Sequence, residues 1–175
     1  VGRGIGAGIF INGRIVGGDA WGAGEIGHVV VQPHGTLCRC GHYGCLETVA
    51  STSALLTKLD ATQPQSQPWT IAEVQAALAA NDPTVRALVD EAAYYLGIAI
   101  ANVVGLLNAQ SIILAGSLAQ LGNDLLQPLR RSLAQHALQT LVAATDVQVS
   151  TLGSDIVTLG AAALLLANEL GIVRD

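Results

Sequence analysis

Two short apolar segments near the start of the chain are separated by a polar turn, as expected for a pair of strands. Ile5–Ile11 and Arg14–Val16 flank the dipeptide Asn12-Gly13, which favours a tight hairpin because both turn positions take positive φ. A third short strand is predicted at Val29–Val31, ahead of a proline. Residues 1–51 are therefore expected to form a β-hairpin block.

Longer apolar stretches with clear start signals predict helices over most of residues 52–175. Thr70 and Glu73 have the spacing of a capping box, and Asp82 followed by Pro83 is typical of a helix start. Gly171 is expected to end the last helix. The predicted helices are Leu46–Leu59 with a break near Ser51–Ser53, Thr70–Ala80, Asp82–Leu107, Ser117–Leu138 capped by Ser117 with Gln120 and kinked or restarted at Pro128, and Asp155–Leu170.

Two short segments separate these helices and predict strands: Gln110–Leu114, expected to be buried, and Asp146–Ser150, whose apolar and polar residues alternate. Helices alternating with strands indicate an α/β domain in which helices cover a small sheet. The apolar run Ile156–Ala167 is shorter than the ~20 residues of a membrane span, so we expect a buried helix there and no contact with a membrane.

The 175 residues carry a formal net charge of −5 with eight Lys and Arg, and no basic cluster is present. Such a chain is a poor candidate for binding a nucleic acid backbone by itself. No secretory signal is visible, so we expect a cytoplasmic protein. The absence of methionine and the glycine-rich start predict that residues 1–175 are a fragment of a longer protein, cut at a domain junction.

All three cysteines, Cys38, Cys40 and Cys45, lie within eight residues. Three thiolates and one imidazole fill the tetrahedron of a closed, structural zinc site. Spacing alone leaves His28, His34 and His42 as candidates for the imidazole, with His42 the more typical solvent-facing loop residue. Three unrelated buried cysteines are the alternative, since a free cysteine often serves as a small hydrophobic residue.

Glu25 and Glu47 flank the cysteine loop, and carboxylates of this kind orient sugar hydroxyls. Ordinary surface glutamates are an equally open interpretation. Gly4 and Gly6, in the glycine-rich start, and Gly116, at a strand-to-helix junction, are candidates for binding phosphate or nucleotide through backbone N–H groups. A tightly packed hairpin and an ordinary turn explain these glycines as well.

The segments around these residues resemble the signature of the ROK family, named for repressors, open reading frames and kinases. The resemblance is carried by Gly24-Glu25-Ile26-Gly27-His28 followed by Cys38-x-Cys40-Gly41-x-x-Gly44-Cys45-Leu46-Glu47. It implies the C-terminal lobe of an actin-like ATPase (ribonuclease H-like) fold. The zinc ligands that it implies are His28, Cys38, Cys40 and Cys45, and the sugar-binding residues are Glu25, His28 and Glu47.

Arg3 stands where kinases of this family carry a phosphate-binding threonine, and in this it resembles the branch of xylose and N-acetylglucosamine repressors. The resemblance therefore implies the sugar-binding effector domain of a transcriptional regulator, working as a homodimer. The alternative is the C-terminal lobe of an ATP-dependent sugar kinase, which alone would use ATP. The family's catalytic aspartate and its DNA-binding helix-turn-helix precede this lobe, so the chain itself is expected to contain no catalytic residue and to bind no DNA.

Overall fold

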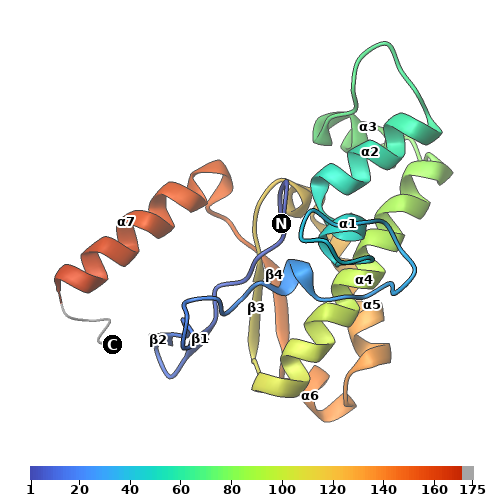
Figure 1. Cartoon of the computed structure of the whole chain (residues 1–175). Coiled ribbons are helices and arrows are strands. Elements are labelled where there is room, and N and C mark those ends of the chain that lie inside the picture. Colours follow the sequence, from blue (N-terminus) through green and yellow to red (C-terminus); the bar gives the residue numbers. More distant parts are fainter. Residues whose placement is uncertain (171–175) are drawn as a thin grey trace.

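The computed structural model describes residues 1–170, in which most of the helices form one body beside two small sheets (Figure 1). The helices are α1 (Glu47–Ala50), α2 (Thr52–Thr62), α3 (Ile71–Ala79), α4 (Pro83–Leu107), α5 (Asn123–His136), α6 (Gln139–Ala144) and α7 (Ile156–Glu169). The strands are β1 (Phe10–Ile11), β2 (Arg14–Ile15), β3 (Ser111–Leu114) and β4 (Asp146–Val149). The predicted α/β composition is confirmed.

The long helix α4 is the centre of the helical body. Asp82 caps it as predicted, accepting hydrogen bonds from the N–H groups of Thr84 (2.8 Å) and Val85 (3.0 Å). The helix ends before Asn108, whose φ of +50° stops the turn. Among the described helices, α4 alone is long and apolar enough to cross a membrane, but half of its most apolar window is buried. It packs against α1, α2, α3 and α5, as a core helix does.

Strands β3 and β4 pair in parallel, with Ile112 opposite Val147. Parallel strands need a long crossover, and α5 and α6 supply it. Leu114 and Val147 are buried, whereas Ile113 is 60% exposed. One face of this sheet is therefore covered by the core and the other is open.

The helix predicted from Ser117 to Leu138 is wrong in its start and in its continuity. The expected helix over residues 117–138 is a 3₁₀ turn (Leu118–Leu121) followed by α5, separated by Gly122 with a φ of +56°. Ser117 caps nothing; its hydroxyl lies 2.9 Å from that of Thr52. Pro128 lies inside α5 and starts no second helix.

The N-terminal hairpin is shorter than expected. Its turn is confirmed, with positive φ at Asn12 (+52°) and Gly13 (+77°), but β1 and β2 contain two residues each. The strand expected at residues 29–31 is a single bridge between Val30 and Cys45. The chain here is held by isolated contacts rather than by a continuous sheet.

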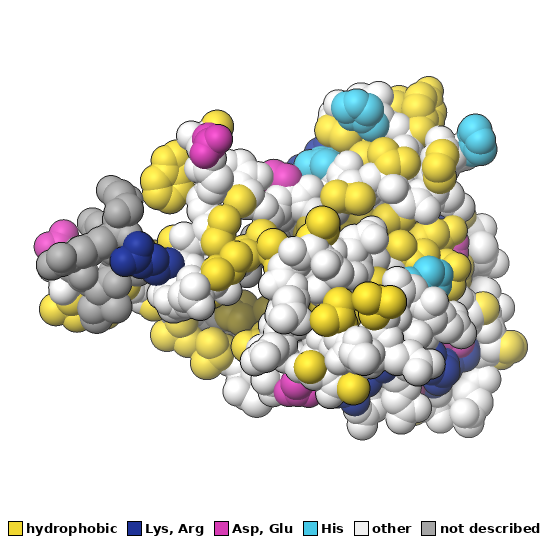
Figure 2. All heavy atoms as spheres, turned by 90° about the horizontal axis from the view of Figure 1, so that it is seen from below, with side chains coloured by type: hydrophobic (Ala, Val, Ile, Leu, Met, Phe, Trp, Pro, Cys, Tyr) yellow, Lys and Arg dark blue, Asp and Glu magenta, His cyan; other side chains and the backbone are white. Residues whose placement is uncertain are grey.

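Helix α7 projects away from the body (Figure 1), so the prediction that residues 156–167 are buried is wrong. Val157 is 77% exposed and Leu165 69%. Hydrophobic side chains are also exposed on the β1–β2 hairpin, where Phe10 is 64% exposed, and Figure 2 shows hydrophobic groups gathered on this part of the molecule. The predicted helix stop at Gly171 lies outside the described residues.

Candidate metal and sugar site

His28 is positioned by a single 3₁₀ turn, Ile26–His28, that lies against the N-terminal segment. The His28 N–H donates to the carbonyl oxygen of Glu25 at 3.0 Å. A Cβ at Gly27 would lie 2.1 Å from the carbonyl oxygen of Ile5, so a side chain does not fit there. The glycine before His28 therefore lets the turn approach the neighbouring backbone and fixes where the imidazole points.

The cysteine loop is folded by its own backbone bonds. The Cys38 N–H donates to the His42 carbonyl at 2.7 Å, and Leu37 and Tyr43 form a bridge beside it. Gly44 has a φ of +70°, and a Cβ there would lie 1.5 Å from the Gln32 carbonyl oxygen. This hairpin places two of the cysteines on its turn and returns the chain directly to the third.

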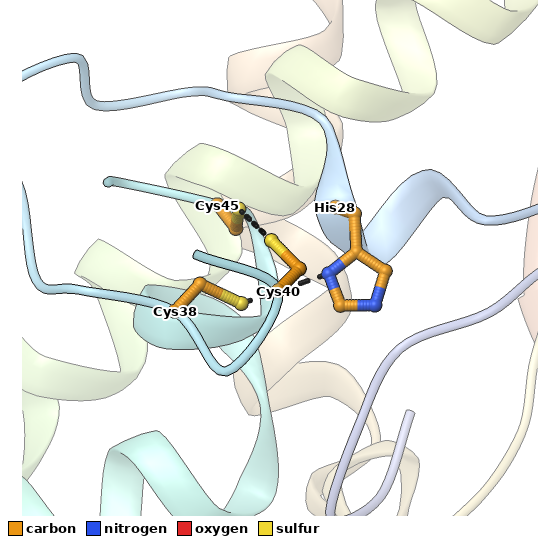
Figure 3. A group of neighbouring side chains, drawn as sticks. All are labelled: His28, Cys38, Cys40 and Cys45. Atoms are coloured by element: carbon orange, nitrogen blue, oxygen red, sulfur yellow. Dashed lines mark hydrogen bonds between the residues drawn. The ribbon is translucent and has the colours of Figure 1, made fainter. Parts of the chain in front are cut away.

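The structure brings His28, Cys38, Cys40 and Cys45 together, with all four ligand atoms within 4.8 Å of one another (Figure 3). His28 Nδ1 lies 3.6 Å from Cys38 Sγ, and the Sγ atoms of Cys40 and Cys45 are 3.6 Å apart. Tetrahedral zinc, with bonds of about 2.3 Å to sulfur and about 2.0–2.1 Å to nitrogen, separates such atoms by about 3.5–3.8 Å. The donor set and its spacing fit Zn²⁺, and zinc binding stays a prediction.

The three thiols differ in their readiness to ionise. Hydrogen bonds from the backbone and ring of His42 lower the pKa of Cys40 to about 6, whereas burial raises the pKa of Cys45 to about 12. Burial also raises the pKa of Cys38. Since thiolates are the metal-binding form, Cys40 offers its sulfur at neutral pH while the other two must lose protons on binding.

Of the three candidate histidines, His28 belongs to the cluster. His42 is exposed, as predicted, although its Nδ1 lies 3.6 Å from Cys40 Sγ. His34 is exposed and outside the cluster. Spacing alone did not identify which histidine joins the cysteines. The 3₁₀ turn Ile26–His28 places the His28 ring beside them.

The two carboxylates lie on opposite sides of the His28 ring. Glu25 Oε2 is 3.9 Å from Nε2, and Glu47 Oε1 is 3.8 Å from Nδ1. Glu25 is 70% exposed at its side chain, whereas Glu47 is buried at the start of α1. The three predicted sugar-binding residues therefore form one array, with an open and a buried carboxylate around an imidazole.

Arg39 is a site residue that the sequence reasoning missed. Its Nε donates to Glu47 Oε1 at 3.1 Å, and Cys38 Sγ donates to the same oxygen at 3.3 Å. Arg39 lies between two predicted zinc ligands, and that position was the available signal. The cysteine loop thus places the Arg39 guanidinium next to the buried Glu47 carboxylate.

The three glycines proposed for phosphate or nucleotide do not share one contact. A Cβ at Gly4 would lie 3.0 Å from Glu47 Oε2, whereas one at Gly116 would lie 2.5 Å from the Val1 carbonyl oxygen. Gly6 lies beside Gly24. Gly4 therefore adjoins the carboxylate array, and Gly116 adjoins the start of the chain.

The sequence profile of the ROK family matches residues 1–168. A glucokinase of Halalkalibacterium halodurans is 35% identical over 182 residues, covering 97% of this chain and 55% of the glucokinase. The DNA-binding transcriptional dual regulator NagC of Escherichia coli is 34% identical over 144 residues, covering 78% of this chain and 36% of NagC. The chain thus spans between about a third and just over half of these relatives.

Solved structures of a ROK transcriptional regulator and of a ROK glucokinase share the fold of this chain. A ROK family transcriptional regulator, a homolog of the E. coli MLC protein, superposes with a TM-score of 0.78 at 30% identity, covering 85% of this chain and 40% of the regulator. A ROK family glucokinase from Streptomyces griseus, in complex with glucose and AMPPNP, gives 0.79 at 26%, covering 94% and 58%. The predicted family resemblance and the kinase-like, actin-like α/β fold are confirmed.

Proposed function

This chain belongs to the ROK family, and we propose that it is the zinc-stabilised sugar-binding domain of a transcriptional regulator. The observation that carries this proposal is the array of Glu25, His28 and Glu47, with distances of 3.9 and 3.8 Å between the carboxylates and the ring nitrogens. Carboxylates accept hydrogen bonds from sugar hydroxyls, and an imidazole N–H adds a donor. Such an array suits a neutral polyol.

We further propose that His28 serves the metal and the sugar through different nitrogens. Nδ1 lies 3.6 Å from Cys38 Sγ, and Nε2 points toward the exposed Glu25. A histidine that binds a metal through one nitrogen offers the other N–H to a hydrogen-bond acceptor. Zinc would be held by His28 and the three cysteines, and it would stiffen the loop that carries Arg39 and leads to Glu47.

Two features favour a regulator over a kinase. Arg3 replaces the threonine expected in a kinase phosphate motif, and NagC is among the relatives. In this proposal residues 1–51 provide the sugar and zinc motif and residues 52–175 the helical support. Sugar binding would close this lobe on the rest of a cytoplasmic homodimer and shift DNA-binding domains that lie outside the chain.

A kinase lobe is the second candidate, and the 35% identity to a glucokinase over 97% of the chain favours it. In that case Gly4, Gly6 and Gly116 would approach ATP, and the array around His28 would orient the sugar. The aspartate that removes the hydroxyl proton would come from another part of the protein.

The deciding experiment uses protein expressed from the complete reading frame. Calorimetry would measure binding of glucose, N-acetylglucosamine and xylose, and a coupled assay would measure ADP formation from ATP with each. Binding without ADP formation supports the regulator, whereas sugar-dependent ADP formation supports the kinase. Glu25→Gln should weaken binding at least about tenfold, because it removes a charged acceptor. The absence of binding to any of the three sugars would refute the sugar site.

A further inference from the structure

Arg39 occupies a turn in which both neighbouring residues of the chain are predicted zinc ligands. The Gly41 N–H donates to the Cys38 carbonyl oxygen at 2.9 Å, which closes a tight turn around Arg39. Cys38 and Cys40 both belong to the cluster around His28. Holding these two cysteines in one metal site would fix the backbone on each side of Arg39, and with it the root of the guanidinium side chain.

From this turn the Arg39 guanidinium contacts the Glu47 carboxylate with two nitrogens. Nε donates to Oε1 at 3.1 Å, and Nη2 donates to Oε2 at 3.5 Å. Glu47 is 8% exposed, whereas the Arg39 side chain is 76% exposed, so a cation at the surface holds a buried carboxylate. A planar fork that meets both oxygens restricts the rotation of the carboxylate more than a single contact does.

The two oxygens of Glu47 have different surroundings. Besides Arg39 Nε, Oε1 has Cys38 Sγ at 3.3 Å and His28 Nδ1 at 3.8 Å. Oε2 has Arg39 as its one hydrogen-bond partner among the residues that the structure describes. A Cβ at Gly4 would lie 3.0 Å from Oε2, so the lack of a side chain there leaves this oxygen uncovered. Oε2 is therefore the oxygen with acceptor capacity left for a ligand.

We propose that Arg39 is a positioning residue of the sugar site, which orients Glu47 so that Oε2 accepts from a sugar hydroxyl and makes this orientation depend on the metal loop. The inference rests on the proposed sugar-binding function and deepens it by naming the residue that links the metal to the sugar. Arg39 and Glu47 both line an open pocket of about 360 Å³, so a ligand has room beside the carboxylate. Such coupling is reciprocal, and the sugar must tighten zinc binding by the factor by which zinc tightens sugar binding.

The first test is a double-mutant cycle on the affinity for glucose, N-acetylglucosamine and xylose. Calorimetry measures it with zinc-loaded protein expressed from the complete reading frame. Arg39→Gln should weaken sugar binding about three- to tenfold, a loss kept modest by the exposure of the Arg39 side chain. In a Glu47→Gln background the same substitution should change the affinity less than about twofold, whereas in a Glu25→Gln background it should keep its full effect. Equal effects in the two backgrounds would overturn the positioning role.

Two further variants separate orientation from charge. Arg3→Gln removes the same charge from an exposed arginine that lines the same pocket but forms no ion pair or hydrogen bond within the described part of the chain, and it should change the affinity less than about twofold. Arg39→Lys keeps the charge without the fork and should restore the affinity only in part. Full recovery with lysine, or equal weakening by Arg3→Gln and Arg39→Gln, would overturn the orientation of Glu47 by Arg39.

The second test measures the coupling from the metal side, by competition with a zinc indicator in the presence and absence of each sugar. The sugar should tighten zinc binding in the parent, and Arg39→Gln should reduce this gain about three- to tenfold, leaving the part transmitted through His28. An equal gain in parent and variant would overturn the inference while leaving the proposed function intact. No sugar binding by the zinc-loaded parent would instead refute the proposed function, and this inference with it.

Discussion

Gly27→Ala tests whether the close approach of the His28 turn to the N-terminal segment is real. A Cβ at Gly27 would lie 2.1 Å from the Ile5 carbonyl oxygen, and ordinary contact begins near 3.4 Å, so the two segments must separate by about 1.3 Å. Gly27 does not take a positive φ, so the backbone itself tolerates alanine. The steric contact is therefore the whole perturbation.

The cost follows from the size of that displacement. Forcing extra atoms into a packed site destabilises a protein by about 1–3 kcal/mol, and each kcal/mol lowers the melting temperature of a domain of this length by about 2–4 °C. We expect a decrease of roughly 2–12 °C. His28 follows Gly27 directly and lies 3.6 Å from Cys38 Sγ, so a misplaced imidazole should also lower zinc affinity by about 10–100-fold.

Calorimetric melting and competition with a zinc indicator measure both effects, with Gly22→Ala as the matched control. A Cβ at Gly22 would meet nothing within 4 Å, and this glycine also lacks a positive φ. The control should keep its zinc affinity and melt within about 2 °C of the parent. Equal melting temperatures and equal zinc affinities for the two variants would refute the packing argument.

Three further predictions address the metal, the acid limb and the core. Cys40→Ser should reduce bound zinc, measured by atomic absorption, well below the one ion per chain expected of the parent, and an unchanged content would contradict the ligand assignment. Hydrogen bonds led by that from the Val85 N–H lower the pKa of Asp82, so its stabilising effect is present above the ordinary carboxyl pKa and is lost as pH falls through the lowered value. In Asp82→Asn the free energy of unfolding, measured by urea titration, should therefore fall less steeply as the pH is lowered into the acid range. The same pH dependence in the variant and the parent would contradict this role of Asp82. Leu129→Ala, at a fully buried position, should cost about 2–5 kcal/mol in urea unfolding, whereas Leu106→Ala, at an 84% exposed position, should cost under about 0.5 kcal/mol; equal costs would contradict the core assignment.

Elements whose signals lie within three or four residues of one another were predictable from the sequence. The capping box is present, since the Thr70 N–H donates to the Glu73 carboxylate at 2.7 Å and the Glu73 N–H to the Thr70 hydroxyl at 3.3 Å. The break before α2 is also as expected, because Ser51 caps that helix through the Ala54 N–H. Such interactions join residues that are close in sequence, so residue type and spacing are enough to predict them.

Interactions between distant residues were not predictable in the same way. The Ser117 hydroxyl, expected to cap a helix, lies 2.9 Å from that of Thr52, 65 residues away in sequence, and the expected helix is a 3₁₀ turn at Leu118–Leu121 followed by α5. The apolar pattern of α7 predicted burial, yet Leu165 is 69% exposed. An apolar pattern indicates that a helix favours being covered, but it does not identify the covering surface.

The candidate site combines both kinds of information at His28. The three-residue spacing from Glu25 is local, and a single 3₁₀ turn places that carboxylate 3.9 Å from Nε2. The approach of Nδ1 to Cys38 depends instead on the cysteine hairpin folding back onto the turn. Loss of the metal should therefore misplace both the imidazole and Glu47, whereas loss of the exposed Glu25 carboxylate should weaken sugar binding with zinc still in place. This difference follows from the two nitrogens of one ring, and it makes the metal and the sugar roles separable by substitution.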